Sequence, residues 1–222
     1  MTEESDDQFS GDGAGRMDAI AKGPLAPIYP VIARQAIEIC GITAGRCIDI
    51  GSGPGHLAMA LSAVSDLEID ALDPSADMLR IAEQNIREAG LAGRVHPISG
   101  DVHDLPYDDD SVDLIVSRGS LFFWDDRARA FSEIWRVLRP GGRTFVGGGF
   151  GTAALKAAIT AKMREIDPEW EEKAAGRLAQ ANRDAIRRDL ERAGIPACEI
   201  HEDEAGFWIV MPEVRADAMH DL

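Results

Sequence analysis

The chain has 222 residues, of which 45% are hydrophobic and 28% charged, a balance that suits a globular domain with a buried core. Its formal net charge is -16, and its densest basic stretch, Arg183–Arg192, is interrupted by acids, so we expect no nucleic-acid partner. No apolar run approaches the roughly 20 residues of a membrane span and the amino terminus is acidic, so we expect a cytoplasmic protein without a membrane partner.

The amino-terminal region divides into a polar stretch and a helical stretch. Residues 1–15 are acidic and rich in small side chains, which predicts a disordered tail. Two helices are expected next, over Arg16–Ala21 and Pro30–Cys40, with a kink at Pro24 and Pro27 between them.

From residue 46 onwards, predicted strands and helices alternate. Strands are expected at Arg46–Ile50, Leu67–Leu72, Arg94–Ile98, Val112–Ser117 and Thr144–Gly147, and a hairpin at Cys198–His201 and Phe207–Met211. Helices are expected at His56–Val64, across Met78–Ala89, and at Arg127–Leu138, Thr152–Ile166 and Glu169–Ala193. This alternation predicts the α/β class, with a mostly parallel sheet, helices on both faces and an antiparallel edge.

The most informative stretch runs from Cys47 to His56. A short apolar strand ends there in a loop with Gly51, Gly53 and Gly55 at alternate positions, and a helix is expected to begin directly afterwards. Glycines let a backbone come within contact distance of a ligand, because no Cβ stands in the way. The first N–H groups of the helix and its positive dipole end point to the same place. The loop therefore predicts a site for a small polar ligand that carries an anionic group.

A nicotinamide or flavin dinucleotide is one candidate ligand. The segment Gly53–Ala58 fits the pattern G-x-G-x-x-G/A, and Asp73 follows at about the spacing of a ribose-binding acid. Two features favour a different ligand. A further glycine at position 51 follows Asp49, and Pro54 lacks an N–H group that a pyrophosphate would use.

Several motifs follow one another in a fixed order along residues 34–147. They are Asp49-x-Gly51-x-Gly53-x-Gly55, Asp73 after the second strand, Gly100-Asp101 after the third, and the runs Asp101–Pro106, Ser111–Ile115 and Trp135–Gly142. Together they resemble the class I S-adenosylmethionine-dependent methyltransferases, especially the branch with quinone-biosynthesis and other small-molecule enzymes. The resemblance implies a three-layer Rossmann-like sandwich with a seven-stranded, mostly parallel sheet in the order 3-2-1-4-5-7-6, the last strand antiparallel. It also implies S-adenosylmethionine as the cofactor.

The same resemblance implies a domain organisation. After the tail at 1–15, residues 16–222 would form a single methyltransferase domain, in which 16–45 are a helical lid and 46–211 the Rossmann-like core. The oligomeric state stays open between a monomer and a homodimer.

The resemblance further implies which residues hold the cofactor. They are Asp49, Gly51, Ser52, Gly53, Gly55, Asp73, Pro74, Met78, Asp101, Val102, Ser117 and Arg118. The glycine loop would approach the methionyl part. Asp73 would accept both ribose hydroxyls, or alternatively cap the helix that follows Pro74. Asp101 would accept from the adenine amino group beside the Val102 N–H, or alternatively serve as a turn residue after Gly100.

The segment after the fourth predicted strand is the candidate acceptor region. The expected substrate contacts are Tyr29, Phe122, Phe123 and Trp124. Aromatic rings suit a cationic sulfonium, but packing in the core is an equally open role for them, as it is for Met78. Arg118 is expected either to pair with a carboxylate or to clamp an anionic substrate.

The predicted function is methyl transfer to a small-molecule acceptor by in-line displacement. No catalytic residue is assigned, because neither His56 nor His103 stands out as a general base. The three cysteines are far apart among apolar residues, so no metal site is expected. Two alternatives remain, an NAD(P)-dependent oxidoreductase and a catalytically inactive cofactor-binding partner subunit.

Overall fold

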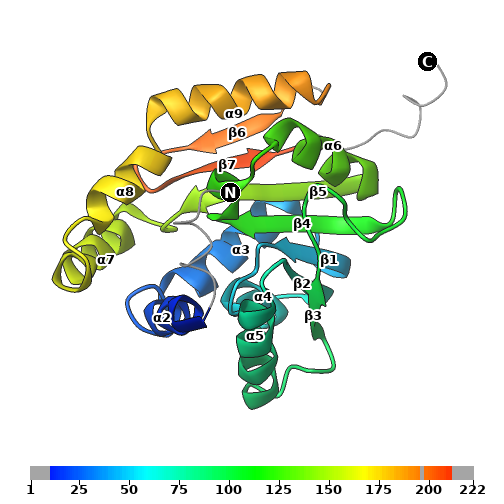
Figure 1. Cartoon of the computed structure of the whole chain (residues 1–222). Coiled ribbons are helices and arrows are strands. Elements are labelled where there is room, and N and C mark those ends of the chain that lie inside the picture. Colours follow the sequence, from blue (N-terminus) through cyan, green and yellow to red (C-terminus); the bar gives the residue numbers. More distant parts are fainter. Residues whose placement is uncertain (1–10, 196–197, 212–222) are drawn as a thin grey trace.

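The computed structural model of the chain describes residues 11–195 and 198–211. Within them, seven strands form one sheet in the order β3-β2-β1-β4-β5-β7-β6 (Figure 1). The strands are β1 (Ala44–Ile50), β2 (Asp66–Asp73), β3 (Val95–Ser99), β4 (Val112–Arg118), β5 (Leu138–Gly149), β6 (Glu199–Glu202) and β7 (Gly206–Val210). Strands β1 to β5 run parallel, and β7 is antiparallel to both β5 and β6. The predicted fold class and strand order are confirmed.

Helices cover both faces of this sheet. They are α2 (Gly11–Lys22), α3 (Ile28–Cys40), α4 (His56–Ser62), α5 (Ala76–Glu88), the 3-10 turn η1 (Ser120–Phe123), α6 (Arg127–Val137), α7 (Ala153–Ile166), α8 (Trp170–Arg177) and α9 (Gln180–Arg192). Side chains of α3, α4 and α5 belong to one core and those of α6 and α9 to the other, so the two groups cover opposite faces. Helix α9 is at the top of Figure 1 and α5 at the bottom.

Alternate residues of the central strands enter two separate cores. Leu114 of β4 packs with the α3–α5 side, whereas the adjacent Ile115 packs with the α6–α9 side, and both are fully buried. Each such side chain contributes about 1.5–3 kcal/mol when it leaves water. A strand buried on both faces appears in the sequence as a continuous apolar run, which is the pattern that predicted it.

The amino-terminal helix is longer than expected. Helix α2 begins at Gly11, so it extends into the segment 1–15 that was predicted as a disordered tail, and that boundary is corrected. Ala14 and Ala21 of α2 are buried, and Asp18 bonds to Asn85 of α5, so tertiary contacts stabilise a helix that local composition disfavours. The remaining part of the predicted tail, 1–10, lies outside the described residues.

The fifth strand also begins earlier than predicted. The strand was predicted over Thr144–Gly147, but α6 ends at Val137 and β5 starts directly afterwards at Leu138. The register jumps from Leu138 opposite Val112 to Arg143 opposite Leu114. Residues 139–142 therefore bulge out of the ladder, which is how a strand accommodates Pro and Gly.

The long helix predicted over Glu169–Ala193 is two helices. Helix α8 ends at Arg177 and α9 begins at Gln180. The Asn182 side chain donates to the Arg177 carbonyl at 2.7 Å, so a side chain of α9 satisfies the carboxyl end of α8.

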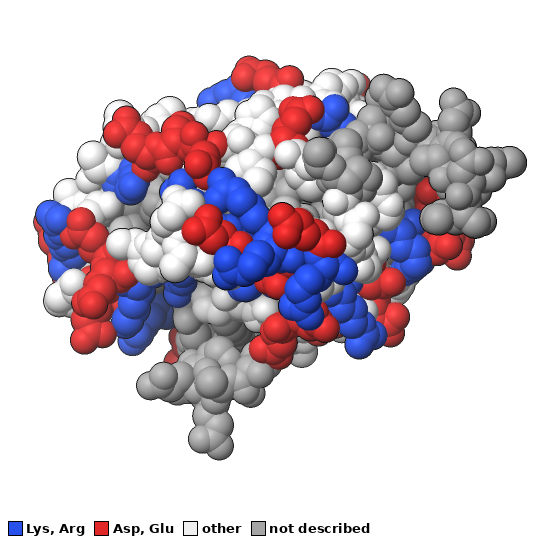
Figure 2. All heavy atoms as spheres, turned by 90° about the horizontal axis from the view of Figure 1, so that it is seen from above, with Lys and Arg blue, Asp and Glu red and all other residues white. Residues whose placement is uncertain are grey.

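The face formed by α9 carries the basic stretch noted in the sequence. Arg183 and Arg187 pair with Glu202 of β6 at 3.4 and 2.9 Å, and Arg127 pairs with Asp189 at 2.7 Å. Figure 2 shows the basic and acidic side chains interleaved over this face. It is therefore a surface of mixed charge. Among residues 11–195 and 198–211, none of the helices has the length and apolar character needed to cross a bilayer.

Candidate cofactor and acceptor site

The glycine loop follows β1, at the edge where the parallel strands have their carboxyl ends. Gly51, Gly53 and Gly55 have φ angles of 66, 53 and 85°, all in the left-handed region. Side chains disfavour this region, so the alternating glycines are a direct requirement of the backbone path.

The three glycines face different surroundings. A Cβ at Gly51 would lie 2.3 Å from the Ser120 Cβ, and one at Gly55 would lie 3.4 Å from the Ala82 Cβ. A Cβ at Gly53 would meet only the Met78 sulfur, at 4.0 Å. Gly51 and Gly55 therefore serve the packing of the protein on itself, and Gly53 borders the open side of the loop.

The N–H groups of the loop are largely used within the protein. Those of Gly51 and Ser52 donate to the Leu72 carbonyl at 2.8 and 3.0 Å, and that of Gly53 donates to Asp73 at 2.8 Å. They cannot at the same time be donors to an anionic ligand. The loop uses these three N–H groups to fix its own shape against β2, so the anionic group of a ligand is expected at the first N–H groups of α4 instead.

Asp73 is buried at the end of β2 and points to the loop. One carboxylate oxygen accepts from the Gly53 N–H at 2.8 Å and the other from the Ser75 N–H at 2.9 Å. Burial raises the pKa of Asp73, while these two N–H groups oppose the rise. The cap of α5 is Ser75, whose hydroxyl accepts from the Met78 N–H at 3.3 Å, so the capping role is not that of Asp73. A carboxylate offers about four acceptor positions, so Asp73 can accept further hydrogen bonds.

The loop also contains a buried hydroxyl, that of Ser52. It has no hydrogen-bond partner among the described residues, and such a group is expensive to bury unpaired. Ser52 directly precedes Gly53, and its N–H is bonded to the carbonyl of Leu72, the residue before Asp73. These three features fit a ligand rich in hydroxyl and amino groups, as the implied cofactor is.

Asp49 is buried at the end of β1 and faces the protein. Its carboxylate accepts from the Ala58 N–H in the first turn of α4 at 3.1 Å. Burial raises the pKa of Asp49 to about 8, against the effect of that N–H group. Its observed contact therefore secures the start of α4 to the sheet.

Asp101 follows β3 and is exposed. One of its oxygens accepts from the His103 N–H at 2.8 Å and contacts His103 Nδ1 at 2.5 Å. Burial would raise the pKa of Asp101, but the hydrogen bonds from His103 lower it overall. The Asp126 N–H donates to His103 Nε2 at 3.3 Å, so Nδ1 carries the proton of a neutral ring. The turn role considered for Asp101 is present, and Val102 beside it is buried in the α6–α9 core.

Ser117 connects the carboxyl ends of β4 and β1. Its hydroxyl bonds to that of Ser120 at 2.6 Å, and Ser120 donates to the Ile50 carbonyl at 3.0 Å. Ser117 is fully buried, so this network holds η1 against the glycine loop.

Arg118 is the last residue of β4 and is half-buried. Its Nε donates to the Gly149 carbonyl at 3.2 Å, and its guanidinium carbon lies 5.8 Å from the centre of the Phe150 ring. No carboxylate of the described residues lies within 4.0 Å of it, whereas the arginines of α9 named above are paired. Of the two roles expected for Arg118, the ion pair is not observed in this part of the chain.

The aromatic candidates separate into two groups. Trp124 packs edge-on against Phe131 of α6 at 5.9 Å between ring centres, and it is buried. The Phe122 ring occupies the space above Gly148 and joins the same core. Core packing, the alternative considered for these rings, is the observed role of both. Phe123 differs, because it lies under the guanidinium of Arg177 from α8, 4.8 Å from the ring centre.

Tyr29 brings the second amino-terminal helix to the loop. It lies in the first turn of α3, and its ring centre is 5.4 Å from that of His56 in α4. Burial raises the pKa of Tyr29, while the nearby positive charge of Arg118 opposes the rise. Tyr29 therefore lies between the glycine loop and the end of β4.

Sequence reasoning missed Asp18, which attaches α2 to the loop. Its carboxylate contacts Lys22 at 2.8 Å, His56 Nε2 at 3.0 Å and the Asn85 amide at 2.9 Å. Asn85 also donates to the Pro54 carbonyl inside the loop at 3.0 Å. The partners His56 and Asn85 are 38 and 67 residues away, so no local pattern could have identified Asp18.

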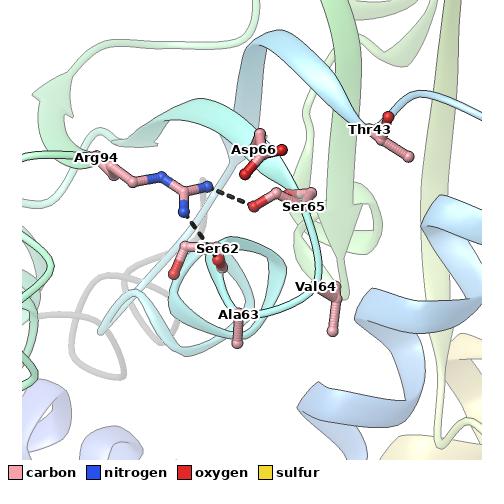
Figure 3. Close-up of a pocket in the computed structure, with 7 residues that line it drawn as sticks. All are labelled: Thr43, Ser62, Ala63, Val64, Ser65, Asp66 and Arg94. Carbon is pink, nitrogen blue, oxygen red and sulfur yellow. Dashed lines mark hydrogen bonds between the residues drawn. The ribbon is translucent and has the colours of Figure 1, made fainter.

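A separate hollow lies at the opposite edge of the sheet, between the end of α4 and the start of β2 (Figure 3). The Arg94 guanidinium there donates to the carbonyls of Ser62, Ser65 and Leu67 at 3.2, 2.6 and 3.1 Å. A cation bonded to the last carbonyls of a helix stabilises its negative end. The observed role of Arg94 is therefore structural.

Comparisons with known proteins identify the family of the chain. Residues 48–146 match the family described as a methyltransferase domain. A crystal structure from Methanococcus maripaludis, of a candidate S-adenosyl-L-methionine-dependent methyltransferase, is 48% identical, and the match covers 93% of this chain and 94% of that one with a TM-score of 0.90. A methyltransferase structure from Aquifex aeolicus, 17% identical with a TM-score of 0.65 over 93% of this chain and 100% of that one, shares the fold.

The ubiquinone/menaquinone biosynthesis C-methyltransferase UbiE of Geotalea daltonii is 32% identical over 104 residues. That match covers 46% of this chain and 44% of the relative, so the chain matches less than half the length of this curated relative. The likeness to the Methanococcus maripaludis structure extends over nearly the whole of both chains. The chain therefore belongs to the class I S-adenosylmethionine-dependent methyltransferase family.

Proposed function

We propose that this chain binds S-adenosylmethionine across the glycine loop and transfers its methyl group to a small-molecule acceptor. The observation that carries the proposal is the pairing of Asp73 with Gly53. It joins a carboxylate that has spare acceptor positions to the loop glycine that borders open space. An ionised or partly ionised carboxylate is well suited to accept from both hydroxyls of a ribose.

When bound, the cofactor supplies a methyl group already activated by its sulfonium charge, so the protein has to align the reactants and exclude water. Asp73 and Ser52 bind the polar parts of the cofactor, and Gly53 leaves room for them. Asp18 and Tyr29 hold the amino-terminal helices over the loop, which supports a role for residues 16–45 as a lid on a single domain.

Four further residues complete the proposed cofactor site. Met78 lies beside the open side of Gly53, and Pro74 is exposed next to Asp73. Asp101 uses one oxygen for its turn and offers the other to an adenine amino group, next to the backbone of Val102. No general base is part of the proposal, because a base is needed only where the acceptor loses a proton.

The acceptor is proposed to be a small molecule, with no nucleic-acid or membrane partner, and the protein to act in the cytoplasm as a monomer or homodimer. The net charge of -16 and the interleaved charges of the α9 face support this proposal, since neither suits a polyanion (Figure 2).

The proposal is tested by titration calorimetry, which measures the binding of S-adenosylhomocysteine and of NADH to the full chain. We expect binding of the first and none of the second, together with transfer of a labelled methyl group from S-adenosylmethionine to a small molecule in a metabolite extract. Binding of NADH alone would favour the oxidoreductase alternative. Binding of S-adenosylhomocysteine with no labelled product in any extract would favour the inactive subunit.

A further inference from the structure

Two arginines near the proposed acceptor region have no acidic partner among the described residues. Arg118 ends β4, and Arg177 ends α8 with its guanidinium over the Phe123 ring. Both are half-buried. No carboxylate of residues 11–195 or 198–211 lies within 4.0 Å of either, although the chain has 39 acidic and 23 basic residues.

The two positive charges act on each other. Burial lowers the pKa of Arg177, and the charge of Arg118 lowers it further. Arg118 lies against Phe150, which contacts Trp170 of α8, the helix that ends at Arg177. An anion bound to both arginines would offset the repulsion between their charges.

Most of the other half-buried arginines among the described residues are paired with an acid, and Arg94 is bonded to three backbone carbonyls instead. Arg127 contacts Asp189 at 2.7 Å and Arg136 contacts Glu133 at 2.7 Å. The half-buried arginines with a structural role therefore have their donors satisfied by carboxylates or by several carbonyls.

The Arg118 side chain donates to the Gly149 carbonyl, and Arg177 lies over the Phe123 ring. Arg118 ends β4 at the edge of the sheet where the glycine loop lies, and α8 lies beyond this edge in Figure 1.

The surroundings of the pair are aromatic and well fixed. Phe150 is buried beside Arg118, and Trp170 of α8 packs edge-on against it at 5.8 Å between ring centres. The segment after Phe150 is fastened to α3, because Gln35 donates to the Gly151 carbonyl at 2.8 Å. The two guanidiniums thus both contact aromatic side chains.

We infer that Arg118 and Arg177 together bind the anionic head group, a carboxylate or a phosphate, of an acceptor whose apolar or aromatic body packs against Phe123 and Phe150. The inference rests on the proposed methyltransferase function, since it names the class of its acceptor. Guanidinium groups bind such anions through two parallel N–H···O hydrogen bonds. The head group would contact the two arginines, and the apolar body would contact the two phenylalanine rings.

Calorimetric titration of the full chain loaded with S-adenosylhomocysteine tests this inference. The probes are phenyl phosphate, benzoate and the neutral benzyl alcohol, which share one ring. We expect at least one anion to bind about tenfold or more tightly than benzyl alcohol, and R177Q to remove that advantage. R177Q should leave the affinity for S-adenosylhomocysteine unchanged. Tighter binding of phenyl phosphate indicates a phosphorylated acceptor, and tighter binding of benzoate a carboxylated one.

The matched control is R188Q, which removes an exposed arginine of α9 and should alter neither affinity. Equal binding of the anions and benzyl alcohol to the wild type, or unchanged anion binding in a folded R177Q, would overturn the inference. A loss of S-adenosylhomocysteine affinity in R177Q would overturn it as well, because the pair would then hold the cofactor carboxylate. If S-adenosylhomocysteine does not bind the wild type, the proposed function fails first and this inference fails with it.

Discussion

The backbone N–H of Gly53 donates to the carboxylate of Asp73 at 2.8 Å and so joins the loop after β1 to the end of β2. The two residues are 20 positions apart in the sequence, but the parallel pairing of β1 and β2 brings their strand ends side by side. Because the bond fixes the loop and leaves acceptor positions on the carboxylate, one side chain both shapes the site and can bind a ligand in it.

Replacing Asp73 by Ala should weaken binding of S-adenosylhomocysteine by about 1.5–3 kcal/mol, the range of hydrogen bonds to a charged group. Titration calorimetry measures this change. The control is D66A, which removes an exposed carboxylate at the other end of the same strand and should not change the affinity. Equal affinities of D73A and the wild type would contradict the assignment of Asp73.

The loop glycines should separate folding from binding. A methyl group at position 51 would collide with Ser120, so G51A should lower the free energy of unfolding by about 2–5 kcal/mol through overpacking and left-handed strain. At position 53 only the strain remains, so G53A should lower it by about 1–2 kcal/mol.

The two glycine variants should differ in the opposite sense in ligand affinity: G51A is expected to lose more stability, and G53A more affinity. G53A puts a methyl group on the open side of the loop and should weaken S-adenosylhomocysteine binding by about tenfold or more. Urea denaturation measures the stability of both variants, and calorimetry measures their affinity for S-adenosylhomocysteine. A G53A protein with normal affinity would show that the ligand does not approach this part of the loop.

Asp18 should control how firmly α2 is attached. D18A removes the partner shared by His56 and Asn85, and should cost about 1–3 kcal/mol because Asn85 keeps a buried donor with one bond fewer. We expect faster amide hydrogen exchange across α2, with a smaller effect on the sheet. D12A, in the first turn of the same helix, is the control; it removes only a charge that favours the helix dipole, so it should speed the exchange of α2 much less than D18A does.

Asp49 should make the stability of the protein depend on pH. Its pKa is raised to about 8 in the folded state from 3.8, so the folded chain keeps a proton that the unfolded chain has lost. The contribution of Asp49 to the unfolding free energy is therefore fully present at a pH below its pKa in the unfolded chain. It declines as the pH rises towards its pKa in the folded chain, by up to about 1.4 kcal/mol per pH unit.

The variant D49N keeps an oxygen that can accept from Ala58 but does not titrate. The difference in unfolding free energy between D49N and the wild type should therefore grow in favour of D49N from about pH 5 to about pH 7, as measured by urea denaturation. A difference that is constant with pH would show that Asp49 titrates alike in both states.

Local patterns in the chain predicted the α/β fold class, and the order of its motifs carried the family resemblance that implied the strand order. Central parallel strands are buried on both faces and appear as continuous apolar runs, and the residues at their carboxyl ends stand at fixed distances along the chain. The loop with glycines at 51, 53 and 55 could also be predicted from the sequence, because their left-handed φ angles are local requirements of the backbone.

Tertiary structure decided what depends on partners distant in the sequence. Phe123 and Trp124 are neighbours, but the turn η1 directs one beneath Arg177 and the other into the core beside Phe131. The early start of α2 depends in the same way on Asn85, a partner 67 residues from Asp18. Periodicity and propensity describe neighbours along the chain, whereas these positions are set by contacts that form only once the sheet and its helices have packed.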